Sequence, residues 1–295
     1  MTHVTTVHLI DASPYLFRAW FSLPKSIVDP AGQPANAVYG FVSFLAKYIA
    51  DEKPAHIGVA FDRHFNHSFR NEYYPAYKAQ REESPKELEA QVDPALEATE
   101  ALGVTTFIDE RYEADDLIAT AMHQTRASRA HYVIVTSDKD MTQLVTEKTV
   151  VVDPARNLRF DADAVEAKFG VKPEQIVDFL ALAGDTVDNI PGVKGIGPKT
   201  AAQLLQRFGS LEAIYENVPA MSKSKTRGDV SLAAKLQECA DLAGMSKRLA
   251  TVATDAPIDV TLDTLRYRGP DEARLDTLFA RLGFATLRER VTRGA

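Results

Sequence analysis

Three carboxylates fall within four positions at the start of an apolar helical pattern, at Glu113, Asp115 and Asp116. Glu113 and Asp116 are three residues apart, so on a helix they share a face. The unpaired N–H groups of a first helical turn favour negative charge. Taken alone, the stretch predicts a helix with an acidic N-terminus, which is a common structure.

Further aspartates follow three apolar runs that have the character of buried strands. Asp11 ends VTTVHLI, Asp62 follows HIGVAF, and Asp138 comes shortly after HYVIVT. Each aspartate by itself is an ordinary cap or turn residue. Open parallel sheets bind their ligands beyond the carboxyl ends of the strands, so the recurrence predicts one acidic crevice that includes the helix start at Glu113.

Carboxylates that crowd together repel each other, and each one is costly to remove from water. Hard divalent cations relieve both costs, and Mg²⁺ prefers oxygen ligands. Two such ions can clamp an in-line displacement at phosphorus, with one activating water and the other stabilising the leaving oxygen. The pattern therefore predicts metal-dependent phosphodiester hydrolysis. A single cysteine, Cys239, excludes an internal disulfide and a multi-cysteine metal site.

Two other stretches have the residue types of nucleic-acid contacts. Residues 192–200 read GVKGIGPKT, and their glycines allow a tight turn whose N–H groups, with two lysines, would face a phosphate. A bare turn between helices is the alternative. Residues 70–81 combine Arg and Lys with three tyrosines, which suits phosphate binding and base stacking. An ordinary solvated loop is the alternative there.

The elements that must position these residues alternate along the first half of the chain. Apolar runs at 4–11, 56–61, 104–108, 131–136 and 149–153 predict strands, with helices predicted at 15–20, 35–50, 87–102, 113–126 and 141–145. This alternation predicts an α/β fold with a mostly parallel, twisted central sheet flanked by helices. After about residue 165 the pattern becomes helical, at 165–169, 173–183, 200–208, 232–249 and 271–282, with 254–260 extended.

The totals are those of an ordinary soluble globular protein of 295 residues. No apolar run reaches the roughly 20 residues of a membrane span, and the N-terminus lacks the order of a signal peptide, so a cytoplasmic location is expected. The net charge of −7 argues against nucleic acid only superficially. Nine acids are assigned below to one site, so the remainder of the chain is slightly positive.

Several motifs together resemble the 5′-nuclease family, the flap endonucleases and 5′–3′ exonucleases that include the N-terminal domain of bacterial DNA polymerase I. The resemblance covers nearly the whole chain. One departure is Ala12, where the family commonly has glycine. No polymerase domain follows Ala295, so a standalone bacterial member is expected. The motifs are ID at 10–11, FRA at 17–19, AFD at 60–62, YPAYK at 74–78 with Arg81, EADD at 113–116, SDKD at 137–140, GD at 184–185, DNIPG at 188–192 and GIG at 195–197.

The resemblance implies two groups of metal ligands for two or more Mg²⁺ or Mn²⁺ ions. The first group is Asp11, Asp62, Glu113, Asp115 and Asp116, and the second is Asp138, Asp140, Asp185 and Asp188, with Asp115 shared. Asp115 and Asp138 are expected to be catalytic, as are Lys78 and Arg81, which would hold and polarise the scissile phosphate.

The resemblance also implies a helical arch at about 66–100 and a helix-hairpin-helix at about 184–210, which grips duplex DNA and holds a K⁺ ion. Tyr77 would stack on a terminal base. The implied division is a nuclease core at 1–165, a helical DNA-binding region at 166–255 and a C-terminal segment at 256–295 that packs on the core. The expected DNA contacts are Arg70, Tyr77, Lys78, Arg81, Gly192, Lys194, Gly195, Gly197, Lys199 and Thr200.

The implied activity is a structure-specific 5′ nuclease in replication and repair. Its substrates would be 5′ flaps, nicked or gapped duplexes and RNA–DNA primer ends. A monomer that works alongside a DNA polymerase and a ligase is expected. Two alternatives remain open: a junction-binding protein that has lost catalysis, and a ribonuclease of the related small α/β family.

Overall fold

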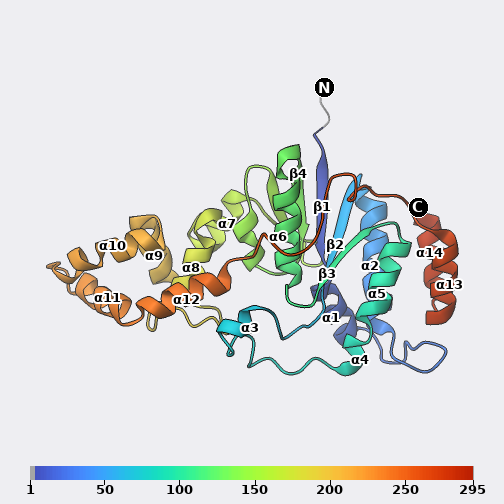
Figure 1. The fold of residues 1–295 in the computed structure, drawn as a ribbon, viewed down its shortest axis with the longest axis horizontal. Helices are drawn as coiled ribbons and strands as arrows, with labels where there is room; N and C mark the ends of the chain where they lie inside the picture. The colour runs from blue at the N-terminus through green and yellow to red at the C-terminus, as the bar shows by residue number, and fades with distance from the viewer. Residues whose placement is uncertain (1–3, 295) are drawn as a thin grey trace.

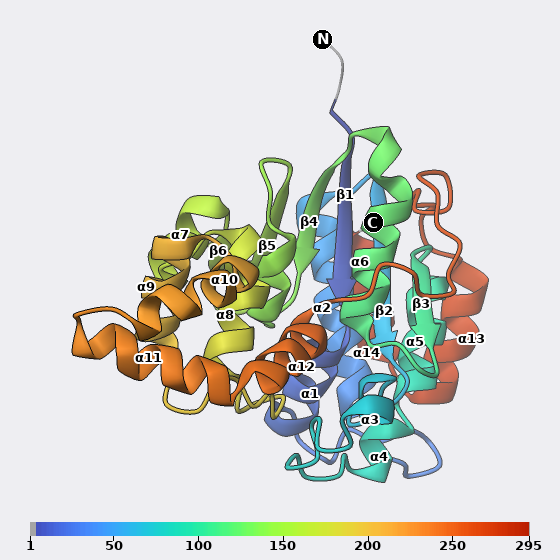
Figure 2. The same ribbon diagram turned by 60° about the vertical axis from the view of Figure 1, so that its left-hand side comes forward.

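The computed structural model describes residues 4–294, apart from the side chains of residues 289, 290 and 292–294. A six-stranded sheet in the order β3-β2-β1-β4-β5-β6 forms its centre (Figure 1, Figure 2). The first five strands are parallel and β6 is antiparallel, which confirms the predicted mostly parallel sheet. The strands are β1 (Thr6–Asp11), β2 (His56–Asp62), β3 (Thr105–Asp109), β4 (His131–Val135), β5 (Thr149–Asp153) and β6 (Leu158–Phe160).

The central strands are apolar because helices cover both faces of the sheet, as parallel sheets require. One face packs mainly against α6, with the helical region further along. The other face packs against α1, α2 and α5, and α13 and α14 lie outside them, against α5 and α2. The helices are α1 (Ser13–Ser22), α2 (Asn36–Glu52), α3 (Arg70–Tyr73), α4 (Lys86–Glu89), α5 (Val92–Ala101), α6 (Ala114–Thr125), α7 (Ala162–Phe169), α8 (Ile176–Ala183), α9 (Pro198–Phe208), α10 (Leu211–Ser222), α11 (Arg227–Glu238), α12 (Ala240–Ala250), α13 (Glu272–Leu282) and α14 (Ala285–Gly294).

The helix predicted at 87–102 is broken in two. α4 and α5 are separated by a turn at Gln91, whose side-chain oxygen accepts hydrogen bonds from the N–H groups of Ala37 and Val38. The glutamine therefore caps the start of α2, which has no capping side chain of its own. The excursion between β2 and α5 contains only the four-residue helices α3 and α4, so it is mostly turn and coil.

Residues 254–260, which were expected to be extended, form neither helix nor strand. They run along α6, where the side chain of Gln124 bonds both Ile258 and Val260 through their backbones. The short strand β6 was not predicted, because three residues are too few to show a periodicity.

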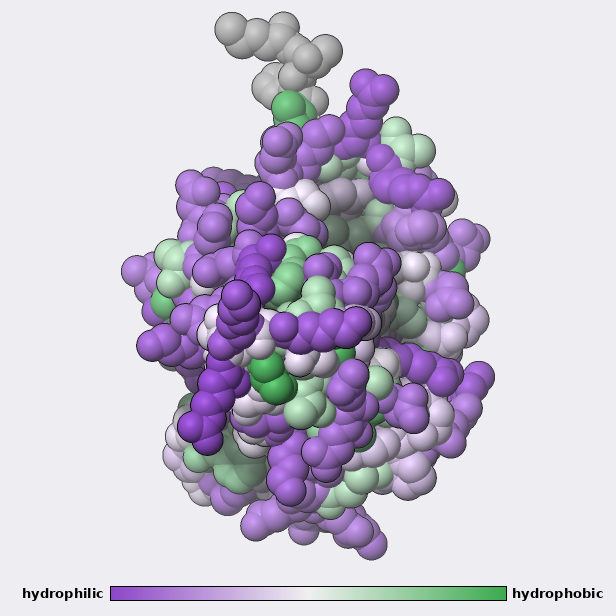
Figure 3. Space-filling view, turned by 90° about the vertical axis from the view of Figure 1, so that its left-hand side faces the viewer, coloured by the Kyte–Doolittle hydropathy of each residue, from purple (hydrophilic) through white to green (hydrophobic). Residues whose placement is uncertain are grey.

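The helices α7 to α12 project to one side of the sheet, whereas α13 and α14 lie at the other side (Figure 1). The projecting end carries mostly hydrophilic side chains (Figure 3). The sheet edge at the carboxyl ends of the strands lies between these parts. The predicted division at residues 165 and 255 stays a prediction.

Gly103 offers a test of this packing. Its φ is +78°, and an added Cβ would lie 1.9 Å from the carbonyl oxygen of Gly269. We expect Gly103→Ala to lower the free energy of unfolding by more than about 1 kcal/mol, measured by urea denaturation. Gly244→Ala is the matched control, because this helical glycine has open space around it, and it should stabilise by about 0.5–1 kcal/mol. Equal changes in the free energy of unfolding for the two variants would contradict the close approach of Gly103 to the Gly269 carbonyl.

Candidate active site

A cleft of ≈ 540 Å³ lies at the carboxyl ends of the parallel strands. Eight of the nine predicted acids line it, together with five cationic side chains. The acids come from β1, β2, the start of α6, the segment after β4 and the loop after α8. The eight acids are Asp11, Asp62, Glu113, Asp115, Asp138, Asp140, Asp185 and Asp188.

Short polar side chains fix the strand-end carboxylates. Asp11 accepts hydrogen bonds from the Ser13 N–H and from the Thr136 hydroxyl, at 3.0 and 2.9 Å. Asp62 accepts from the Ser13 hydroxyl and from the Ala114 N–H, which ties β2 to the first turn of α6. Ser13 and Thr136 were missed in the sequence, because isolated hydroxyl residues beside a strand end carry no distinctive signal.

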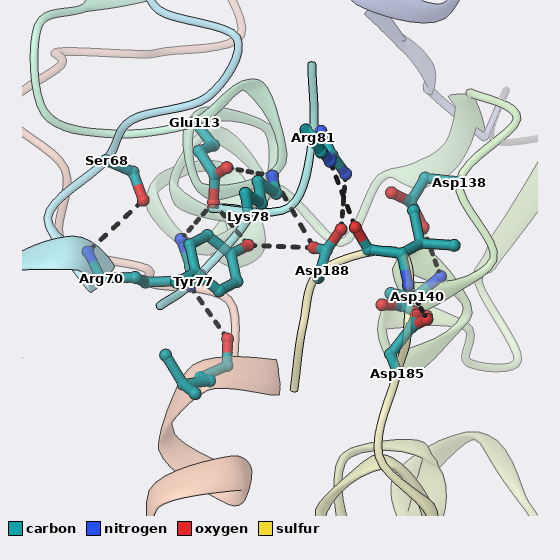
Figure 4. A network of polar contacts seen from close by, with 12 residues as sticks. Ser68, Arg70, Tyr77, Lys78, Arg81, Glu113, Asp138, Asp140, Asp185 and Asp188 are labelled. Carbon is teal, nitrogen blue, oxygen red and sulfur yellow. Dashed lines mark hydrogen bonds and ion pairs between the residues drawn. The ribbon is translucent and has the colours of Figure 1, made fainter. Parts of the chain in front are cut away.

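Three of the eight acids are paired with cations (Figure 4). Lys78 binds Glu113, and Arg81 binds Asp188 at 2.5 Å. Lys139, which belongs to the SDKD motif but was given no role from the sequence, lies 2.9 Å from Asp185. Burial alone would raise the pKa of Glu113, but the neighbouring cations Lys78 and Arg70 lower it to about 2. Burial likewise opposes the charge of Lys78, yet its acidic neighbours raise its pKa.

The other five acids have no ion-pair partner within the described part of the chain. Burial is the largest cause that raises the pKa of each, and like charge adds to it. Asp115 shows this best, because Asp138, Asp11 and Asp62 all raise its pKa further. The five are Asp11, Asp62, Asp115, Asp138 and Asp140.

Asp116 is absent from the cleft, although it was predicted as a ligand. Its side chain is fully buried and receives two hydrogen bonds from Arg70, each of 2.8 Å. It also accepts from the Glu113 N–H, as part of a capping box at the start of α6. Arg70 is 3% exposed, so in this structure it pairs with acids rather than facing DNA. The structure therefore does not favour Asp116 as a metal ligand or Arg70 as a DNA contact.

Tyr77 also differs from its predicted role. The residue is 3% exposed, and its hydroxyl donates toward Glu113 and Asp188, at 3.1 and 3.0 Å. Its ring consequently presents no open face on which a base could stack. The tyrosine instead joins the helix start at Glu113 to the loop that carries Asp188 (Figure 4).

Residues 76–81 are bonded to the loop after α8 through the backbone. The Lys78 N–H donates to the Asp188 carbonyl, and the Gln80 side chain donates to the carbonyls of Thr186 and Val187. Asn189 returns a bond to the carbonyl of residue 76. Lys78 and Asn189 both have a positive φ, at 55° and 56°, which is uncommon for residues other than glycine. These bonds hold the predicted catalytic cations over the acids.

The glycine-rich turn connects α8 to α9, outside the cleft. Lys194, Gly195, Gly197 and Lys199 are exposed, and Thr200 is partly exposed. Gly192 is buried, and a Cβ there would lie 2.4 Å from the Gly184 nitrogen, so its role is close backbone packing.

The donor set fits hard divalent cations, since it consists of carboxylate oxygens with no cysteine or histidine. Among the side chains that the structure describes, no group of three or more Asp, Glu, His or Cys is already arranged to hold an ion directly. Mg²⁺ usually keeps several waters, which allows carboxylates to bind it at longer range. The five unpaired acids supply the negative charge that such ions would neutralise.

Comparisons with known proteins identify the family. Residues 6–170 match the model of the 5′-3′ exonuclease N-terminal resolvase-like domain, and residues 171–273 match the model of the 5′-3′ exonuclease C-terminal SAM fold. The chain belongs to the 5′–3′ exonuclease family.

Curated relatives of this exonuclease-family chain include DNA polymerase I of Bacillus subtilis, 39% identical over 99% of the chain, and that of Pseudomonas aeruginosa, 40% identical over 94%. The chain spans only about a third of these relatives, at 33% and 30% of their lengths.

Solved structures confirm the fold of the exonuclease-family chain. The T5 D15 protein, co-crystallised with metal ions, has a TM-score of 0.70 at 19% identity, with 98% of this chain and 97% of that one covered. The catalytic core of Rad2 in complex with DNA substrate has a TM-score of 0.65 at 16% identity, with 98% and 92% covered.

Removal of the Arg70 guanidinium tests the buried ion pairs. We expect Arg70→Met to lower the free energy of unfolding by about 3–5 kcal/mol in urea denaturation, because Asp116 would remain as an uncompensated buried charge. Arg111→Met is the control, since Arg111 pairs with Glu72 on the surface and its removal should leave the free energy of unfolding little changed. An unchanged stability of Arg70→Met with weakened DNA binding would restore the role predicted from the sequence.

Asp115→Asn tests the crowding of charge. The pKa of Asp115 is raised in the folded state, so the folded protein binds this proton more tightly than the unfolded chain does. The resulting stabilisation is complete below the ordinary pKa, near 4, and is lost as the pH rises through the folded pKa. Asparagine should therefore stabilise the protein in EDTA at pH 8 by about 1 kcal/mol. The gain should shrink as the pH falls toward 4.

Thermal unfolding across this pH range measures the effect of Asp115→Asn. Asp163→Asn, on an exposed residue in the first turn of α7, is the control and should give no gain. A destabilised Asp115→Asn at pH 8 would show that this carboxylate contributes favourably to the metal-free fold.

Proposed function

We propose that this chain is a structure-specific 5′ nuclease that hydrolyses DNA phosphodiesters near single-strand/duplex junctions and leaves a 5′-phosphate. The observation that carries the proposal is a cluster of five carboxylates, buried or half-buried and without an ion-pair partner among the described residues, at the carboxyl edge of the sheet. Lys78 and Arg81 are held above them. Family membership and neighbours described as a flap endonuclease with DNA and metal ions, and as Rad2 with DNA substrate, support it.

Two or more Mg²⁺ or Mn²⁺ ions fit the donor set. The unpaired acids Asp11, Asp62, Asp115, Asp138 and Asp140 would hold them. Glu113, Asp185 and Asp188 can join only when their cationic partners move away. Bound ions would supply an activated water and neutralise charge on the leaving oxygen. Asp115 is the natural shared ligand, because acids of both predicted groups raise its pKa.

Lys78 and Arg81 would hold the reacting phosphate. In this structure their charges are directed at Glu113 and Asp188. When cations neutralise these acids, both side chains become free to donate hydrogen bonds to phosphate oxygens. Fixed donors that face developing charge are an effective form of transition-state stabilisation.

The turn between α8 and α9 would contact the duplex as a helix-hairpin-helix. Lys194 and Lys199 are exposed there, and the N-terminus of α9 leaves backbone N–H groups available to a phosphate. Such contacts position DNA without reading its sequence. A K⁺ ion held by the turn remains part of the proposal, as does the division into a core at 1–165, a DNA-binding region at 166–255 and a C-terminal segment.

Substrates would be 5′ flaps, nicked or gapped duplexes and RNA–DNA primer ends. We propose a cytoplasmic monomer that acts alongside a polymerase and a ligase. Among residues 4–294, no helix is both long and apolar enough to cross a membrane. Flap binding without cleavage in any divalent metal would favour the junction-binding alternative, and a strong preference for single-stranded RNA would favour the ribonuclease.

Cleavage of a 5′-labelled flap duplex tests the proposal. The wild-type chain should cut near the junction with Mg²⁺ and not with EDTA. Asp138→Asn and Lys78→Ala should each lower turnover by about a hundredfold or more, the loss expected for a group that stabilises transition-state charge. Asp163→Asn, on the exposed start of α7, should cut at the wild-type rate. Wild-type rates for either cleft variant would contradict the role of that residue.

A further inference from the structure

Two cations of the cleft, Arg156 and Lys168, have no part in the proposed catalysis. Arg156 lies in the turn between β5 and β6, and Lys168 lies in the last turn of α7. Neither residue stands out in the sequence, because both belong to ordinary polar stretches. The strand order places the turn at the end of the sheet edge that is farthest from β2 and β3.

These two cations differ from the other three in their pairing. Lys78, Arg81 and Lys139 each bind a carboxylate of the cleft at 2.9 Å or less. The Arg156 guanidinium lies 3.7 Å from Asp153, and its side chain is 68% exposed. Lys168 has no ion pair among the described residues, and its ammonium lies over the rings of Phe160 and Phe169, at 4.4 and 5.3 Å from their centroids.

The charge of the cleft lining therefore changes sign along one edge of the sheet. Asp62 and Asp11 end β2 and β1, and Asp138 follows β4. The two cations that pair with no acid of the cleft follow β5 and β6, and Asp153, the partner of Arg156, does not line the cleft. A nucleic-acid strand laid along this edge would place one phosphate over the acids and their metal ions. An adjoining phosphate would then reach the cations. Arginine forms bidentate contacts with phosphate, and the aromatic rings restrain the lysine before binding.

We propose that Arg156 and Lys168 bind the phosphodiester next to the one that is cleaved, on the same strand. This inference rests on the proposed nuclease function. The two side chains hold the strand in place and do not touch the reacting atoms. Because they are not engaged with the acids, they are available to DNA before Lys78 and Arg81 are released. They would form the first electrostatic contact of the cleft with its substrate.

The salt dependence of binding gives the first test. Each phosphate contact contributes a slope of about one to the fall of log affinity with log salt. The Arg156→Ala/Lys168→Ala variant should bind a flap duplex in EDTA about tenfold or more weakly, as expected when charged hydrogen bonds are lost. Its salt slope should be smaller by about one, because the two cations share one phosphate. Arg156→Lys/Lys168→Arg should keep the wild-type slope.

Arg159→Ala is the matched control for charge. Arg159 is exposed on β6, three residues from Arg156, and does not line the cleft. This variant should keep the affinity and the slope of the wild type. A loss as large as that of the double variant would mean that the whole β5–β6 turn attracts DNA nonspecifically, and it would overturn the proposed contact.

A neutral linkage in the DNA gives the sharper test. A methylphosphonate at the position next to the scissile phosphate removes one charge. It should raise KM for the wild type by about tenfold and leave kcat little changed, and it should have no further effect on the double variant. Equal sensitivity of both proteins would contradict this inference while the wild type still cleaves. Failure of the wild type to cleave an unmodified flap would instead contradict the proposed function.

Discussion

The buried guanidinium of Arg70 connects three parts of the fold on which the site depends. It binds Glu113 and Asp116 at the start of α6, and it donates to the carbonyls of Leu249 and Thr251 at the end of α12. Unpaired charge is costly at this depth, so the three segments are held in one arrangement. Glu113, fixed in this way, then holds Lys78 over the cleft. The position of the predicted catalytic lysine thus depends on a guanidinium that does not itself line the cleft.

The hydrogen-bond ladder of the sheet prevents the strand-end acids from moving apart. Asp11 is aligned with Ala60 of β2, and β2 ends two residues later at Asp62. Repulsion between the two carboxylates can therefore be relieved only by protons or by cations. The protein supplies lysine and arginine to three acids, and five have no ion-pair partner among the described residues. This incomplete compensation gives the cleft its affinity for additional positive charge, at some cost to the metal-free fold.

The alternation of apolar runs was enough to predict the parallel sheet, and the aspartates after those runs were enough to predict the crevice. Residue type and spacing could not reveal which way a side chain points. Asp115 and Asp116 are adjacent and chemically identical, yet one faces the cleft and the other faces Arg70. Arg70 and Tyr77 lie in a segment that looks like a solvated loop, and only long-range packing buries them. Ser13, Gln80 and Lys139 act through partners distant in sequence, which a local pattern does not contain.

The backbone bonds between residues 76–81 and 186–189 also bear on how such chains can diversify. The two segments belong to different halves of the chain, one matched by each family model. Gln80 reaches two carbonyls of the second half, and Asn189 reaches one carbonyl of the first. Recombination between relatives at a breakpoint near residue 170 would therefore join loops that have not been selected together. Viable chimaeras should be those in which both partners keep the same loop lengths and the same left-handed residues at 78 and 189.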